Sequence, residues 1–144
     1  MAEETMTPEE GRKALKAALG YTDEQIDELI ANPKRREIIE HLAEISSKRM
    51  IAECIAEENC VYHDVGDRYV FSGLGQLLKE ESCEQPCLFA MANFPPFCNM
   101  LYDRVASGLD PNGMHLDHIQ CSDTTLKYGG FGKATFRIYV EDAT

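Results

Sequence analysis

The chain has 144 residues, 44% of them hydrophobic and 27% charged, which is an ordinary globular composition and predicts one packed domain over residues 1–144. Its net charge of −11 repels phosphate backbones and anionic lipids, so we expect no nucleic-acid partner and no membrane-surface role. The sequence contains neither a secretion signal nor an apolar run long enough for a membrane span, so we expect a cytoplasmic protein.

The first third of the chain carries two strong helix-start signals. Thr7 and Glu10 have the spacing of a capping box, which predicts a helix start at that point. Gly20 is the residue type that commonly ends such a helix. Thr22 and Gln25 repeat the capping-box spacing. A second helix is therefore expected directly after the first.

Residues 34–47 predict a third helix, because apolar residues recur there at helical spacing. Short amphipathic helices draw most of their stability from burial. We therefore expect the helical part, residues 1–47, to pack on a sheet or on a second subunit, and the second case would make a homo-oligomer. The apolar residues of this surface are Leu15, Leu19, Ile26, Leu29, Ile30, Ile38, Leu42 and Ile45.

The second part, residues 48–144, is predicted to be mixed. Residues 49–57 alternate like a strand although their alanines and glutamates favour helix, and we predict a strand. Residues 133–140 alternate more cleanly and predict the last strand. Further strands are expected over 68–72 and 114–121, and helices over 86–93 and 97–107. This order predicts an α+β fold, with N-terminal helices packed on a small, mostly antiparallel sheet that carries a further helical layer.

Cysteine and histidine supply the residues suited to chemistry. Without a secretion signal, cysteines are expected to be thiols, thiolates or metal ligands rather than disulfides. Cys60 with His63 and His118 with Cys121 form two pairs, each three residues apart, that could offer four ligands to zinc. Residues three apart in a regular strand point to opposite faces, so His118 would need a bend to join Cys121. The alternative is that the cysteines are small core residues. The six cysteines are Cys54, Cys60, Cys83, Cys87, Cys98 and Cys121.

Two glycine-containing segments border these residues. Gly66 and Asp67 predict a turn that begins the 68–72 strand and aims Cys60 and His63 inward. Residues 128–132 contain three glycines and predict a flexible turn before the last strand rather than a phosphate loop.

Several short motifs together resemble an uncharacterised family of small prokaryotic cysteine-containing proteins. The resemblance covers nearly the whole chain and implies that Cys60, Cys87 and Cys121 are the site cysteines, with His63 as a further ligand and no ligand at position 118. It implies no reaction. The motifs, in chain order, are residues 19–24, 32–34 and 65–71, Cys87 before a hydrophobic helix, and residues 110–112, 120–123 and 129–132.

Two functions compete on this basis. The first is a small metal- or thiolate-dependent protein that binds or transforms a small molecule, with Cys60, Cys87 and Cys121 converging near His63 and Asp123. Its cofactor would be zinc with an open coordination position or an iron–sulfur cluster. The second is a non-catalytic accessory or interaction subunit in which the cysteines are structural. The sequence leaves open whether the chain is an enzyme.

Overall fold

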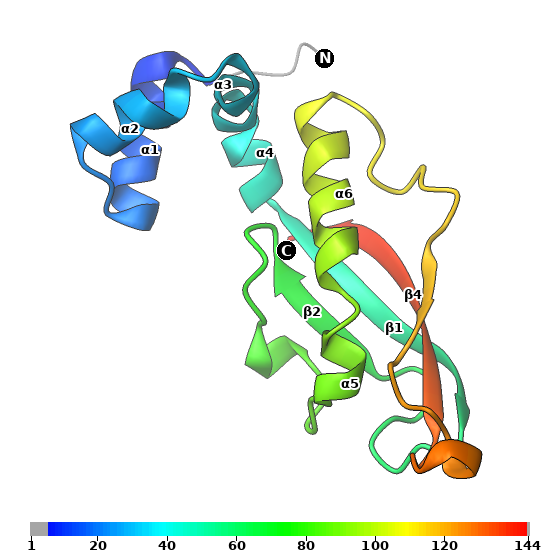
Figure 1. The fold of residues 1–144 in the computed structure, drawn as a ribbon. Helices are drawn as coiled ribbons and strands as arrows, with labels where there is room; N and C mark the ends of the chain where they lie inside the picture. Colours follow the sequence, from blue (N-terminus) through cyan, green and yellow to red (C-terminus); the bar gives the residue numbers. More distant parts are fainter. Residues whose placement is uncertain (1–5, 144) are drawn as a thin grey trace.

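The computed structural model describes residues 6–143. Four helices come first and a four-stranded antiparallel sheet follows, which confirms the predicted α+β class (Figure 1). The helices of the first part are α1 (Pro8–Leu19), α2 (Asp23–Ile30), α3 (Pro33–Glu40) and α4 (Leu42–Ser46). The second part contains β1 (Lys48–Glu58), β2 (Arg68–Ser72), the 3-10 helix η1 (Lys79–Glu81), α5 (Leu88–Met91), α6 (Pro95–Ala106), β3 (His118–Gln120), the 3-10 helix η2 (Leu126–Tyr128) and β4 (Lys133–Asp142).

The local signals at the helix ends act as predicted. The hydroxyls of Thr7 and Thr22 accept N–H bonds from the residues three positions on, and both capping boxes are closed. Gly20 ends α1 in the left-handed conformation, with φ of 68°. The helix expected over 34–47 is instead two helices that meet at His41, where ψ is 7°. No glycine or proline marks this break, so no local signal predicted it.

The sheet has the strand order β2-β1-β4-β3. In β1, Met50, Ala52 and Cys54 belong to the main core, so the alternating pattern predicted this strand correctly. Cys54 pairs with Phe136, and a register shift follows immediately after it. Helices α5 and α6 complete this core with Ala90, Phe94 and Leu101, which gives the predicted further helical layer.

Two predicted elements are shorter in the structure. The strand expected over 114–121 is limited to β3, and the helix expected over 86–93 is limited to α5. Cys87 has extended backbone angles just before α5. Helix α6 begins at Pro95, because prolines suit the first positions of a helix. None of the helices in the described residues has the length and apolar character that crossing a bilayer requires.

The helical part has a core of its own. Leu15, Ile26, Ile39 and Leu42 are buried against one another, separately from the core beneath the sheet. Helices α1 and α2 project away from the sheet, whereas α3 and α4 contact α6 (Figure 1). The apolar surface of the helices is thus covered partly by the helices themselves and partly by α6. Packing on a second subunit stays a prediction.

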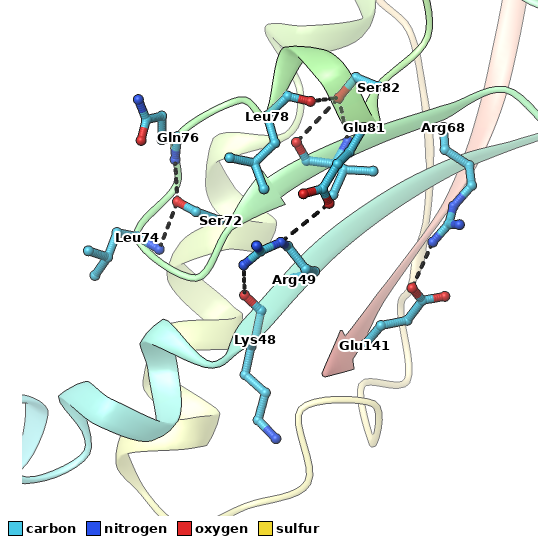
Figure 2. Close-up of polar contacts among 11 residues, drawn as sticks. Lys48, Arg49, Arg68, Ser72, Leu74, Gln76, Leu78, Glu81, Ser82 and Glu141 are labelled. Atoms are coloured by element: carbon cyan, nitrogen blue, oxygen red, sulfur yellow. Dashed lines mark hydrogen bonds and ion pairs between the residues drawn. The ribbon is translucent and has the colours of Figure 1, made fainter. Parts of the chain in front are cut away.

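The chain that follows β2 folds back along that strand. Figure 2 shows the Ser72 hydroxyl accepting backbone N–H bonds at the turn and the Ser82 hydroxyl donating to the Leu78 carbonyl at 2.8 Å. The Leu78 N–H donates to the Val70 carbonyl and the Cys83 N–H to the Arg68 carbonyl, both at 2.8 Å. These bonds cover the edge of β2, which would otherwise expose unpaired backbone groups. They also lead the chain toward Cys87.

The outer face of the sheet carries charged pairs beside the buried Ile51 and Val70. Arg49 contacts Glu81 at 3.4 Å and Arg68 contacts Glu141 at 2.9 Å (Figure 2). Exposed pairs of this kind contribute roughly 0–1 kcal/mol each to stability. The outer face therefore needs no functional explanation.

Candidate functional site

A pocket of about 100 Å³ brings together the residues predicted to carry chemistry. We call it the cysteine pocket. It is lined by residues 60–63 after β1, by Cys87 and Phe89 at the start of α5, and by Cys121, Asp123, Phe131 and Gly132. The four residues predicted as ligands, Cys60, His63, Cys87 and Cys121, all line it. Cys54, Cys83, Cys98 and His118 do not.

The loop that carries Cys60 is held by backbone geometry. Asn59 has a φ of 55° and Gly66 a φ of 100°, so the chain reverses at both ends of the loop. The Gly66 N–H donates to the Cys54 carbonyl at 2.8 Å. The Asp67 carboxylate accepts the Asp64 N–H at 2.8 Å. The predicted Gly66–Asp67 turn is therefore present, and the loop closes back on β1.

A buried hydrogen-bonded chain runs from Cys60 into the core. The Cys60 sulfur lies 3.3 Å from His63 Nδ1, and His63 Nε2 lies 2.6 Å from the Tyr69 hydroxyl. The same hydroxyl accepts the Cys87 N–H at 2.8 Å. Because that oxygen already accepts one bond, its own proton can be donated to His63 Nε2, which leaves the imidazole proton on Nδ1, directed at the Cys60 sulfur. Every polar group in the chain then has a partner.

Burial sets the protonation of this chain. His63 is 2% exposed and packs between the rings of Tyr69 and Phe136, with centroid separations of 5.5 and 5.3 Å. Burial lowers the pKa of His63, since the charged imidazolium is poorly solvated there. Burial also raises the pKa of Tyr69, so the phenol keeps its proton. A neutral imidazole can accept a proton from a thiol or bind a metal.

The third segment of the pocket is anchored to the other two. Cys121 lies just after β3, and its sulfur accepts the Ala134 N–H at 3.4 Å. The Ser122 N–H donates to the Phe89 carbonyl at 2.9 Å, which joins this segment to α5. The Asp123 carboxylate accepts the Phe131 N–H at 3.0 Å and so closes the loop between them.

The glycines of residues 128–132 are explained by close approach. A Cβ on Gly130 would collide with the Asp123 carboxylate, and a Cβ on Gly132 would collide with the Asn59 carbonyl. Gly132 therefore lets the segment before β4 lie against the loop that carries Cys60. A flexible turn was predicted here from the sequence, whereas two of its glycines are required by tight packing.

Zinc can be tested against this donor set. Tetrahedral zinc with bonds of about 2.3 Å to sulfur and 2.0 Å to nitrogen places the two ligands roughly 3.5 Å apart. The Cys60 and His63 atoms, 3.3 Å apart, are close to that spacing. Within residues 6–143, however, no three His, Cys, Asp or Glu side chains are grouped closely enough to hold an ion. The residue types therefore suit zinc. One pair, Cys60 and His63, lies at ligand spacing, and Cys87 and Cys121 line other sides of the same pocket.

The alternative ligand His118 lies outside the pocket. Its side chain is 52% exposed and its Nδ1 lies 2.6 Å from the Asp117 carboxylate. The two pairs have the same spacing in the sequence, although a regular strand would point His118 away from Cys121. The structure brings only His63 into contact with its cysteine.

Tyr69 was not predicted from the sequence to contact the candidate site residues, although its hydroxyl bonds both His63 and the Cys87 N–H. Its position in a β-rich run predicted a strand residue and gave no reason to connect it with cysteines on either side. The spacing of six residues from His63 carries no structural meaning by itself, because the loop between them is irregular.

Comparison with known proteins adds no assignment. No protein-family model matches the chain, and neither curated proteins nor solved structures provide a match. The resemblance described above therefore stays a prediction, and function is argued from the cysteine pocket.

Proposed function

We propose that this chain binds a small molecule in the cysteine pocket and that Cys60, paired with His63, is its reactive group. The observation that supports this most is the 3.3 Å contact between the Cys60 sulfur and His63 Nδ1 in a pocket shared with two further cysteines. A cysteine beside a neutral histidine can transfer its proton to the ring and become the nucleophilic thiolate.

Tyr69 allows His63 to act as that base. With the imidazole proton on Nδ1, the Cys60 sulfur accepts a hydrogen bond and keeps its own proton. In the other tautomer the ring proton is on Nε2 and donates a hydrogen bond to the Tyr69 oxygen, since a phenol can accept as well as donate. Nδ1 is then free to take the proton of the Cys60 thiol. The buried hydroxyl thus supports both tautomers of His63 and orients the ring.

A metal-dependent form of the same site is the second candidate. Cys60, His63, Cys87 and Cys121 would hold zinc, and the three cysteines alone would suit an iron–sulfur cluster. Bound zinc would supply Lewis-acid chemistry. The support for this candidate is the donor set and the spacing of its first pair.

Thiol labelling of anaerobically purified protein tests the proposal. We expect iodoacetamide to modify Cys60 faster than the partly buried Cys98, with sites and rates read by mass spectrometry. His63→Gln should slow Cys60 labelling about a hundredfold or more, the lower end of what a general base contributes. The matched control, His118→Gln, should leave the rate unchanged.

The competing functions predict different results. If Cys60 reacts no faster than Cys98 and His63→Gln has no effect, the proposal is wrong and the accessory-subunit function gains support. Elemental analysis of the same samples tests the metal form. Zinc or iron that is present in the native protein and lost in both Cys60→Ser and Cys87→Ser would establish it.

A further inference from the structure

The mouth of the cysteine pocket is made of large apolar side chains. Val61 is 76% exposed, Tyr62 55%, Phe89 52% and Phe131 74%, and all four line the pocket. Single exposed apolar residues are ordinary on a protein surface, but a group of them around a concave site marks a place for a ligand. Three of the four are aromatic, so they offer flat surfaces on more than one side of the opening.

The backbone beneath these side chains is anchored. The Phe89 carbonyl accepts the Ser122 N–H, and the Phe131 N–H donates to the Asp123 carboxylate. Gly132 lies against the Asn59 carbonyl. These contacts join the three segments that carry the apolar side chains. The aromatic mouth is therefore part of a built site rather than a set of loose loop tips.

The charge around the pocket disfavours an anion. No lysine or arginine is among the residues that line it, and Asp123 is. The nearby Lys133 pairs with Glu58 at 3.5 Å, and Lys127 lies over the Tyr128 ring. An entering carboxylate or phosphate would lose its hydration without gaining a cationic partner. The net charge of −11 adds long-range repulsion.

The size of the pocket limits the ligand. A cavity of about 150 Å³ lined by apolar side chains can hold benzene. The cysteine pocket, at about 100 Å³ and open to solvent, has room for about one ring with part of it at the mouth. A ring in that place would contact the aromatic side chains and bring one edge toward Cys60.

We propose that the cysteine pocket takes a small, uncharged aromatic molecule with an electrophilic carbon, which lies against Phe89 and Phe131 while that carbon meets the Cys60 sulfur. This inference rests on the proposed function, because it needs Cys60 to be the reactive group. The aromatic side chains select the ligand by its ring, and the absence of a cationic side chain in the lining discriminates against anions.

Maleimides provide a matched pair of probes. In the reaction with a maleimide, the Cys60 sulfur forms a bond to one alkene carbon, the carbon–carbon π bond breaks, and the thiol proton, carried by His63, ends on the other carbon. N-phenylmaleimide and N-ethylmaleimide differ only in the ring. The measured quantity is the second-order rate constant of Cys60 with N-phenylmaleimide divided by that with N-ethylmaleimide. Dividing this by the same ratio for N-acetylcysteine corrects for the different intrinsic reactivities of the two reagents and gives a normalised ratio.

We expect a normalised ratio of about three or more in the native protein, the size of one aromatic contact. Phe131→Ala and Phe89→Ala should each bring it toward one, and the matched control Leu116→Ala, a truncation at a 79% exposed residue outside the pocket, should not. A second pair of reagents tests charge. The rate of labelling by iodoacetate, divided by the rate with iodoacetamide, should be lower at Cys60 than for N-acetylcysteine.

The outcomes separate the two proposals. If Cys60 is reactive and sensitive to His63→Gln but the normalised ratio is near one in every protein, the ligand class is wrong and the proposed function stands. If Cys60 reacts with none of the reagents faster than Cys98 does, the proposed function and this inference fail together. A preference for iodoacetate would overturn the discrimination against anions.

Discussion

The described residues of the helical part, 6–47, and of the second part, 48–143, which we call the sheet part, are built in different ways. Helices α1 and α2 begin at capping boxes, α1 ends at Gly20, and the helical part buries a small cluster of aliphatic side chains. The sheet part contains all six cysteines. It also contains His63, the one polar or charged residue classed as buried among those that the structure describes. A buried polar group is costly unless it is paired, so its presence directs attention to the sheet part as the place of function.

The range of the contacts differs as well. The capping boxes join residues three apart in the sequence. The sheet joins Lys48 to Asp142 across almost the whole second part, and the cysteine pocket gathers residues from positions 60 to 132. A change in the helical part should therefore remain more local than a change in the sheet core. Four pairs of substitutions test this difference.

The largest effect is expected at Phe136, whose ring packs on His63, Tyr69 and Phe94. Phe136→Ala should lower the free energy of unfolding by about 4 kcal/mol, measured by urea denaturation, because truncating a buried phenylalanine leaves a cavity. The matched change in the helical part, Ile26→Ala, should cost about 3 kcal/mol and raise hydrogen exchange mainly in α1, α2 and α3. Equal increases in β1 and β4 would show that the two parts unfold as one unit.

The junction between the two parts should be nearly as sensitive. A Cβ on Gly73, in the turn after β2, would collide with the Ile45 carbonyl of α4. Backbone cannot yield as a side chain can, so Gly73→Ala should cost about 3 kcal/mol of unfolding free energy in urea. In Gly11→Ala the new Cβ would collide with a methyl group of the buried Ile39 and not with backbone, and the helix-propensity gain of about 1 kcal/mol opposes the crowding. Similar losses in the two variants would contradict a tight junction at Gly73.

Tyr69→Phe tests the buried hydrogen bonds of the pocket. Removing the hydroxyl leaves His63 Nε2 and the Cys87 N–H without their partner, so we expect a loss of about 2 kcal/mol in thermal or urea unfolding. Cys60 labelling should also become slower, since the ring of His63 is no longer oriented. Tyr139→Phe removes a half-buried hydroxyl that contacts Glu53 on the outer face. That control should cost less than about 1 kcal/mol and leave labelling unchanged.

The smallest effect is the pH dependence due to His63. Burial lowers the folded-state pKa of His63 below its ordinary value of 6.5. As the pH falls below 6.5, His63 is protonated in the unfolded chain before it is protonated in the folded protein. The free energy of unfolding should therefore fall by up to about 1.4 kcal/mol per pH unit until the folded-state pKa is reached. Urea unfolding at several pH values should show this slope in the native protein and in His118→Gln, but a shallower one in His63→Gln. Parallel slopes in all three proteins would mean that His63 takes up its proton over the same pH range in the folded and unfolded states, so that its pKa is not lowered by folding.

Short-range patterns predicted much of the architecture from the sequence. Both capping boxes, the end of α1, the first and last strands of the sheet and the Gly66–Asp67 turn are as expected. These features depend on residues within about four positions, or on strict alternation along one strand, so the physical cause is present in the local sequence.

Contacts between distant segments decided the rest. The close packing of Gly73 against Ile45 and of Gly132 against Asn59, and the bond from the Cys87 N–H to the Tyr69 hydroxyl, join residues that lie far apart in the sequence. His63 and His118 each stand three residues from a cysteine, and the sequence offers only strand geometry as an argument against His118. Only the tertiary structure separates them, because the loop that buries His63 against Tyr69 and Phe136 is closed by the sheet, whereas β3 leaves His118 in solvent.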